Sequence, residues 1–420
     1  MHPLRRPVSL LWSSRDLLPK FNTRGSDSVR VCFISHSAGT GGAERVLLET
    51  IEALRSRGAE CRVIVPERGA LLDELMRLGV EIQVISFPLW MCRGKARFSV
   101  WLKMCLGTII STIVIAKVIH QWRCDIVCTN TATLSVGALA SRLCGRPHVW
   151  YLHEFGMEDQ GLSFLFGDRL SLAMIDRLSA RCICVSHALA SKYAQSMEPS
   201  KVFVIYPSMH KAIVGETPST ANDCSVTRPT GRFRCVIAGA LIEGKGQEDA
   251  ILALRHLRTA GIDGELLIVG QGEPEYRRHL EALVGSNSLE DRVIFTGQVR
   301  SALPLMLSSD IVLVCSRSEA FGRVTIEGMF SGRPVIGARS AATAELIKDG
   351  VNGLLYDPGN PGDLAEKIKR LQECPGLGER LGHEARAWVR GYFTIDRYAD
   401  ELFAVLHPLL NTSDHGTSLA

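Results

Sequence analysis

Two glutamates and the turn between them are the residues of this sequence best placed to do chemistry. Glu319 and Glu327 stand eight positions apart in SRSEAFGRVTIEGMFSGRPVIG, which directly follows the strand-like run DIVLVCS. Residues 320–323 would form the turn into a helix, where backbone N–H groups and the positive helix end suit a pyrophosphate or sugar hydroxyls. A carboxylate on each side can accept hydrogen bonds from a polyol. The structural alternative is that Glu319 caps the helix and Glu327 is a solvated helical residue.

Three further segments place glycines or polar side chains directly after strand-like runs. In HSAGTGGAERV, Gly41 and Gly42 stand where backbone can approach a phosphate closely, although a tight turn alone also explains a glycine pair. In HVWYLHEFG, His153 and Glu154 end an apolar strand, and a lone histidine there is commonly structural. In IAGALIEGKGQEDAI, Lys245 follows the first strand of the second half of the chain.

On these motifs the sequence resembles the family 4 retaining glycosyltransferases of the GT-B fold. Their signature is a pair of glutamates separated by seven residues in the context S-x-x-E-x-F-G, and the resemblance extends from about Val29 to Leu409. It implies that Glu319 contacts the hydroxyls of the donor sugar and that Glu327 binds the nucleotide ribose. The backbone amides of Phe321, Gly322 and Arg323 would hold the sugar and the diphosphate.

The resemblance also assigns roles to the other segments. Gly41 and Gly42 match the glycine-rich donor loop, with Gly42 as the first candidate, and His153 would lie near the donor sugar. The segment EFGMED is similar to one in members that build bacterial polysaccharides, so Glu154 would orient the acceptor. Backbone contacts around Gly270 and Val299 would recognise the base, uridine or guanosine.

One position departs from the family pattern. The phosphate-binding loop of the family reads G-R-x-x-x-x-K-G; this chain keeps Lys245 but has Ala240 in place of the arginine. One of two positive charges expected on the leaving diphosphate is therefore missing. Arg317 or Arg323 could supply a substitute, although both are also explained as solvent-facing residues.

The elements that must position these residues follow a repeated strand–helix pattern, which predicts parallel sheets covered on both faces. We expect an α/β protein of the GT-B class, with two doubly wound Rossmann-like domains facing across a cleft and ligands bound beyond the carboxyl ends of the strands. The stretch GETPSTANDCSVTRPTG has the composition of a linker. The expected division is a tail at 1–28, an acceptor domain at 29–210, a linker at 211–231, a nucleotide-sugar domain at 232–390, a helix at 391–410 and a tail at 411–420.

Composition limits the possible partners and compartments. The chain has 420 residues, 48 of them basic and 44 acidic, so its formal charge of +4 is too close to balance for a nucleic-acid binder. Its 13 cysteines show neither a CxxC pair nor zinc spacing, and the N-terminal run VSLLW is shorter than a secretory core, which predicts buried thiols in a reducing cytosol. No Asp-x-Asp occurs. We therefore expect no metal cofactor, with lysine and helix ends offsetting the diphosphate charge.

The stretch from 82 to 124 contains no acidic residue but several lysines and arginines and three of the six tryptophans. Its apolar run MCLGTIISTIVIA has 13 residues between Lys103 and Lys117, which is too short to span a bilayer. Basic side chains, aromatics and an apolar helix suit a helix lying on an anionic membrane surface through 90–123. A buried helix covering the first sheet is an equal alternative.

These features predict a cytoplasmic, peripherally membrane-associated transferase. It would move a sugar from a nucleotide-diphosphate donor to the hydroxyl of a glycan or lipid-linked acceptor in bacterial surface polysaccharide synthesis, with retention of anomeric configuration. Two alternatives stand beside this reading. A nucleotide-sugar epimerase would need acid and base groups on both sugar faces, and a catalytically silent nucleotide-sugar-binding scaffold is favoured only by Ala240.

Overall fold

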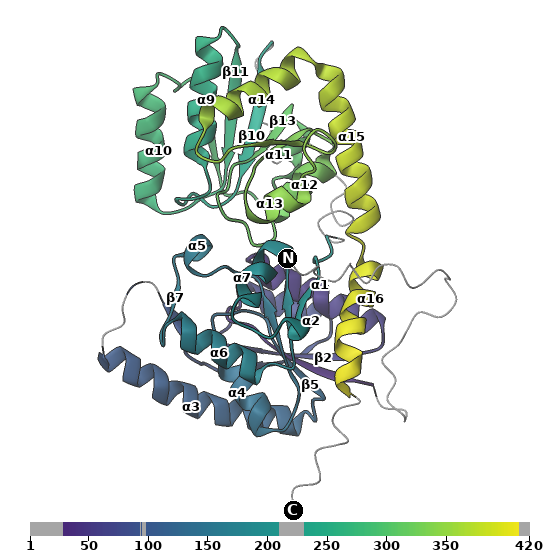
Figure 1. Ribbon diagram of the computed structural model, residues 1–420. Coiled ribbons are helices and arrows are strands. Elements are labelled where there is room, and N and C mark those ends of the chain that lie inside the picture. The colour runs from purple at the N-terminus through teal and green to yellow at the C-terminus, as the bar shows by residue number, and fades with distance from the viewer. Residues whose placement is uncertain (1–27, 93, 95–97, 210–230, 411–420) are drawn as a thin grey trace, which may run out of the picture. The chain divides into compact units, whose positions relative to one another are not determined.

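The computed structural model describes residues 28–92, 94, 98–209 and 231–410. The described chain forms two compact units, one made of residues up to Ser208 together with those from Phe393 onward, and one from Met209 to Tyr392 (Figure 1). The expected tails at 1–28 and 411–420 and the expected linker at 211–231 fall almost entirely outside the described residues.

The first unit contains a seven-stranded parallel sheet in the order β3-β2-β1-β5-β6-β8-β9. Its strands are short runs rich in Val, Ile and Cys, as expected for strands covered on both faces. The strands are β1 Arg30–Ile34, β2 Glu60–Val65, β3 Glu81–Val84, β5 Ile126–Thr129, β6 His148–Leu152, β8 Arg181–Cys184 and β9 Val202–Val204. The helices are α1 Gly42–Ser56, α2 Ala70–Arg77, α3 Phe98–Gln121, α4 Val136–Leu143, α5 Met157–Gln160, α6 Asp168–Leu178, α7 His187–Ala194 and α16 Ile395–Leu406.

The second unit repeats the plan with a six-stranded parallel sheet in the order β12-β11-β10-β13-β14-β15. The strands are β10 Phe233–Ala238, β11 Gly264–Val269, β12 Val293–Gly297, β13 Ile311–Val314, β14 Val335–Ala338 and β15 Leu354–Tyr356. The helices are α9 Gln247–Thr259, α10 Pro274–Ser286, α11 Leu303–Leu307, α12 Arg323–Ser331, α13 Ala341–Leu346, α14 Pro361–Glu373 and α15 Pro375–Tyr392. Each unit is thus one doubly wound parallel-sheet domain, which confirms the predicted pair of such domains.

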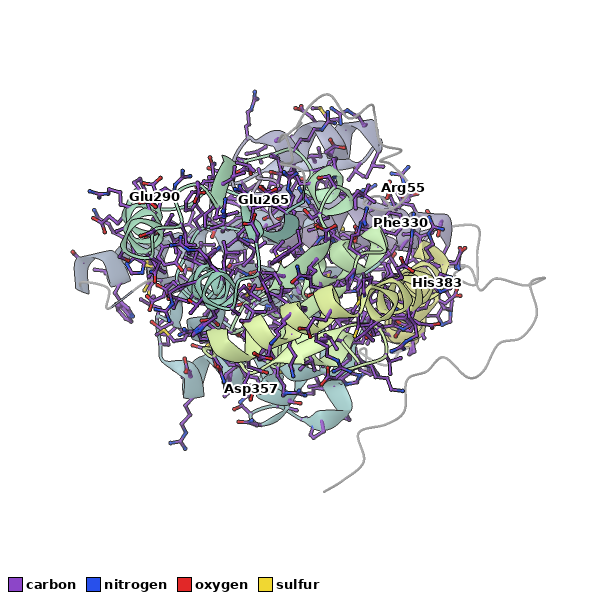
Figure 2. The ribbon with its side chains drawn as sticks, turned by 90° about the horizontal axis from the view of Figure 1, so that it is seen from above. Arg55, Glu265, Glu290, Phe330, Asp357 and His383 are labelled. Carbon is purple, nitrogen blue, oxygen red and sulfur yellow. The ribbon has the colours of Figure 1, made fainter. Side chains whose placement is uncertain are left out.

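Packing between α12 and α15 closes one side of the second unit. Phe330 of α12, labelled in Figure 2, lies under the guanidinium groups of Arg386 and Arg390 from α15, at 5.6 and 5.4 Å from its ring centroid. Deeper inside, the Arg234 side chain donates to Glu265 at 2.5 Å, and both side chains are 2% exposed. Removing either side chain of such a buried pair is strongly destabilising, because the remaining charge would be buried without a partner.

The C-terminal helix α16 belongs to the first unit, where it packs on α1 (Figure 1). The structure begins this helix at Ile395, after the Thr394 hydroxyl caps it by accepting from the Arg397 amide, whereas the sequence pattern suggested one helix from 391. Tyr398 carries the buried contact: its hydroxyl lies 2.6 Å from that of Thr50 and 2.7 Å from that of Tyr151. At roughly 1 kcal/mol net each, these hydrogen bonds fix α16 to the first sheet.

Two findings at α3 and β4 differ from expectation. The helix continues through Lys103 and Lys117 for 24 residues, and Trp101–Gln121 is long and apolar enough to cross a membrane by length and composition alone. The prediction that this segment is too short to span was therefore wrong, since it counted only the run between the lysines. A two-residue antiparallel pair, β4 Met91–Cys92 with β7 Ser163–Phe164, was not predicted.

Candidate active site

Lys245 and Glu319 meet at the carboxyl edge of the second sheet. The chain order reverses between the neighbouring strands β10 and β13, which is the switch point where ligands bind in open α/β sheets. Lys245 lies in the loop after β10 and Glu319 in the loop after β13, and Lys245 Nζ is 2.6 Å from Glu319 Oε1. The side chains are 26% and 18% exposed, so the pair is partly open to solvent.

Backbone contacts hold these two loops together. The Arg317 amide donates to the Gly244 carbonyl at 2.8 Å, which joins the two loops, and the Ala342 amide of α13 donates to the Glu319 carbonyl at 3.1 Å. Gly246 has φ +72°, and a Cβ there would lie 2.2 Å from the Cys315 carbonyl oxygen. Only glycine fits this contact, which explains the Lys-Gly order of the loop.

Helix α12 begins at Arg323, after Gly322 in the left-handed conformation (φ +82°). Its N-cap residue is a glycine and offers no capping side chain, while the Glu319 carboxylate pairs with Lys245. Phe321 is buried, whereas Arg323 and Glu327 are half-buried. The N-terminus of α12 follows Glu319 by three to four residues along the chain, and a helix N-terminus is a potential anion-binding site.

The alanine that replaces the family arginine is exposed. Ala240 follows β10, and its carbonyl accepts from the Gln247 side chain at 2.9 Å. Of the two candidate substitutes, Arg317 is exposed and Arg323 is half-buried.

Gly270 and Val299 follow the adjacent strands β11 and β12 at the same edge of the sheet. Gly270 has φ +133°, and a Cβ there would lie 2.0 Å from the Gly239 carbonyl oxygen, so this position needs glycine for the fold itself. Its amide donates to Gly297 at 2.9 Å. Val299 is half-buried.

In the first unit, the chain order reverses between β1 and β5, and the glycine pair follows β1. Gly41 is the N-cap of α1, and Gly42 is the first helical residue. A Cβ at Gly42 would meet no atom within 4 Å, whereas one at Gly41 would lie 2.6 Å from Glu44 Oε2. Packing within the unit therefore does not require glycine at position 42. Close approach of a ligand would explain a glycine there.

His153 and Glu154 lie at the end of β6 and point into different surroundings. His153 Nε2 is 2.9 Å from Asn130 Oδ1, and Asn130 in turn donates to the Ala43 carbonyl at 2.9 Å, which links the loop after β5 to the first turn of α1. Glu154 is buried, and its carboxylate accepts from the Thr131 hydroxyl and from the amides of Ala132 and His153. Its oxygens thus hold the loop after β5.

Burial raises the pKa of Glu154 above its usual range, while these hydrogen bonds and the nearby His36 oppose the rise. A carboxylate in this setting fixes backbone in place. The geometry favours it as a positioning group behind His153.

A second His/Glu pair lies beside the glycine loop and was not singled out from the sequence. His36 Nε2 is 3.6 Å from Glu44 Oε1, and the Glu44 side chain is 5% exposed. Glu44 Oε1 and His36 Nδ1 are buried and make no hydrogen bond with the residues that the structure describes. The available signal was that His36 follows a strand as His153 does.

Two protein-family models match the chain, one over most of each unit. The model of the glycosyltransferase family 4 domain matches residues 40–210, and that of the group 1 glycosyl transferases matches residues 221–388. The chain belongs to the family 4, group 1 glycosyltransferases. The Lys245–Glu319 site lies within the second matched region.

Among relatives, N-acetyl-alpha-D-glucosaminyl L-malate synthase of Bacillus anthracis is 31% identical over 41% of this chain and 44% of its own length. The lipopolysaccharide core biosynthesis glycosyltransferase LpsD of Rhizobium meliloti is 31% identical over 41% of this chain and 50% of its own length. The matched part thus spans about half the length of these two relatives.

Among solved structures, HepE of Anabaena in complex with UDP aligns over 90% of this chain and 100% of its own, with a TM-score of 0.72 and 23% identity. This likeness confirms the GT-B fold of the family member described here. Among the described residues, no three His, Cys, Asp or Glu side chains are grouped to hold a metal ion.

Proposed function

We propose that this family 4 member transfers a sugar from a nucleotide-diphosphate donor to an acceptor hydroxyl, with retention of anomeric configuration and without a metal ion. The Lys245–Glu319 pair at the switch point of the second sheet carries the proposal, because it places one cation and one carboxylate 2.6 Å apart beside a helix N-terminus. HepE, which shares the fold, is crystallised with UDP and with UDP-glucose.

In the proposed reaction, Glu319 accepts hydrogen bonds from donor sugar hydroxyls and Lys245 moves to the leaving diphosphate. The bond between the anomeric carbon and the phosphate oxygen breaks as the acceptor oxygen bonds to the same face of that carbon. The leaving phosphate oxygen takes the acceptor proton, so no protein base is needed. Catalysis is then orientation together with electrostatic stabilisation by Lys245 and the N-terminus of α12.

For the donor, we propose a UDP- or GDP-sugar bound by the second unit, with Glu327 at the ribose and the loops of Gly270 and Val299 at the base. In the first unit, we propose that His153 and the Gly41–Gly42 loop contact the donor. The acceptor is proposed to be a lipid-linked or polysaccharide glycan at the cytoplasmic face of the membrane. The LpsD relative supports this acceptor class, and the free thiols of the described cysteines fit a reducing compartment.

The test of donor binding is thermal stability of the purified chain with UDP, GDP, ADP and their common sugar conjugates, with and without EDTA. A ligand at 100 times its Kd adds about 2.7 kcal/mol to the free energy of unfolding. We expect a selective shift for one base that persists in EDTA. Loss of the shift in EDTA would contradict metal independence, and no shift with any nucleotide would contradict the donor site.

Incubation with the selected donor separates the alternatives. A transferase produces a glycoside or slowly hydrolyses the donor, an epimerase returns an isomerised donor, and a silent scaffold changes nothing. NMR of the product's anomeric proton then reports retention or inversion directly.

A further inference from the structure

Helix α3 carries an apolar face that the first unit leaves uncovered. Six large apolar side chains on it are each at least 40% exposed, and together they are called the α3 stripe: Leu102, Leu106, Ile109, Ile110, Ile113 and Val114. At 3.6 residues per turn they share one band of the helix surface roughly 140° wide. Figure 1 shows α3 along the outside of its unit, next to α4. Contiguous apolar surface of this kind marks an interaction site.

The opposite face of α3 is built into the unit. Ile115 and Ile119 are buried in the core that also contains Cys32 and Ile34. The Cys144 thiol donates to the Ala116 carbonyl. A transmembrane orientation would pull these side chains out of the core, so α3 can meet a membrane only along its exposed side.

Charge identifies the occupant. Lys103 and Lys117 are exposed on the same band as the α3 stripe, 14 positions apart, which places them at its two ends about 21 Å from each other. Between Glu81 and Asp125 the sequence has no acidic residue. An apolar band flanked by lysines, whose long stems let the ammonium groups reach phosphates, is the pattern of a helix lying in an anionic lipid surface.

The same charges disfavour a second copy of the chain on this face. A twofold contact through the α3 stripe with antiparallel helices would set Lys103 of one copy against Lys117 of the other. No carboxylate on α3 could offset this repulsion, since the helix has none.

We propose that the α3 stripe lies in the plane of an anionic membrane, with its apolar side chains in the acyl boundary and Lys103 and Lys117 among the headgroup phosphates. This inference rests on the surface of the first unit and not on the proposed reaction. Membrane binding is therefore measured without donor or acceptor.

The test is flotation of the full chain with vesicles of phosphatidylcholine alone or with 30% phosphatidylglycerol. We expect binding to the anionic vesicles that falls at least fivefold between 0.1 and 0.5 M NaCl, because salt screens the lysine contribution. The double variant Ile110→Glu/Ile113→Glu should lose at least tenfold in affinity. Lys103→Glu/Lys117→Glu should lose the preference for anionic lipid, and Lys103→Arg/Lys117→Arg should keep it.

Met76→Glu is the matched control, because Met76 is an apolar residue of α2 in the same unit and is 59% exposed. It should bind vesicles as the parent chain does. Light scattering of each variant without vesicles reports self-association. Absence of vesicle binding, equal loss in Met76→Glu, or a dimer that the stripe variant dissolves would each overturn the proposal.

Discussion

Lys245 Nζ lies 2.6 Å from Glu319 Oε1, although 74 residues separate them along the chain. The contact exists because β10 and β13 are neighbours in the sheet and each loop leaves at the same edge. It brings the loop of Lys245 and the first glutamate of the signature together at one edge of the sheet. Before donor binding, the carboxylate thus orients the lysine that the proposed chemistry uses.

Lys245→Ala should lower kcat for the transfer on the order of 10²–10³-fold, the cost of losing one preorganised electrostatic contact to the leaving group. Glu319→Gln should lower it as well, and the double variant should fall short of the sum of the two effects because the residues contact each other. Lys367→Ala is the control, since that lysine is also ion-paired and is 27% exposed, close to the 26% of Lys245. Additive effects would show that the pair does not act as a unit.

Ala240→Arg should restore the second cation of the phosphate-binding loop. Because Ala240 is exposed, the longer side chain has room. A charge-assisted contact at an exposed site contributes about 1 kcal/mol, so the donor KM should fall about fivefold and the gain should shrink in high salt. Ala260→Arg, at an exposed position after α9, controls for added charge alone. If both variants lower KM equally, the loop has no specific need for the arginine.

Gly42→Ala and Gly270→Ala should separate ligand approach from folding. In Gly42→Ala the added Cβ meets no atom within 4 Å, so the free energy of unfolding should change by no more than about 0.5 kcal/mol. Donor turnover should nevertheless fall at least about tenfold, because the Cβ would stand in the path of the ligand. Gly270→Ala forces φ +133° on alanine and a 2.0 Å contact, which should cost about 2–5 kcal/mol. Urea unfolding and initial rates measure both. Full activity of Gly42→Ala would remove that glycine from the site.

His148 should make the first unit sensitive to acid. Burial lowers the pKa of its imidazole from 6.5 to about 3, so the unfolded chain binds a proton that the folded chain does not. The free energy of unfolding is therefore unaffected by His148 above pH 6.5. It falls as the pH drops from 6.5 toward 3, by at most about 1.4 kcal/mol per pH unit. Urea unfolding at pH 7.5, 6 and 5 should show a shallower loss in His148→Gln than in the parent chain.

The exposed His383, labelled in Figure 2, provides the control for that series. His383→Gln should follow the parent chain at every pH. Parallel pH profiles for all three proteins would show that His148 does not titrate as its burial requires.

The sequence by itself determined the strands of the two parallel sheets, the family, and which residues of the second unit are candidates for its site. Runs such as IVLV and VIGA are apolar on both faces, as expected of a covered parallel strand, so the pattern located them directly. The glutamate signature and the lysine loop are local patterns as well. Each lies within a short run of consecutive residues. Such a run determines its own local backbone geometry, so these motifs can be recognised without the rest of the fold.

Only the tertiary structure decided which of these residues share a site and which are used for packing. Strand order brought Lys245 to Glu319 and turned the Glu154 carboxylate inward to hold the loop after β5. The tertiary structure also buried one face of α3 in the core and left the α3 stripe uncovered. The sequence pattern favours a buried helix and a membrane-surface helix equally. The physical reason is that burial and pairing depend on residues far away in the chain, and no local pattern records which neighbour a face or a charge will meet.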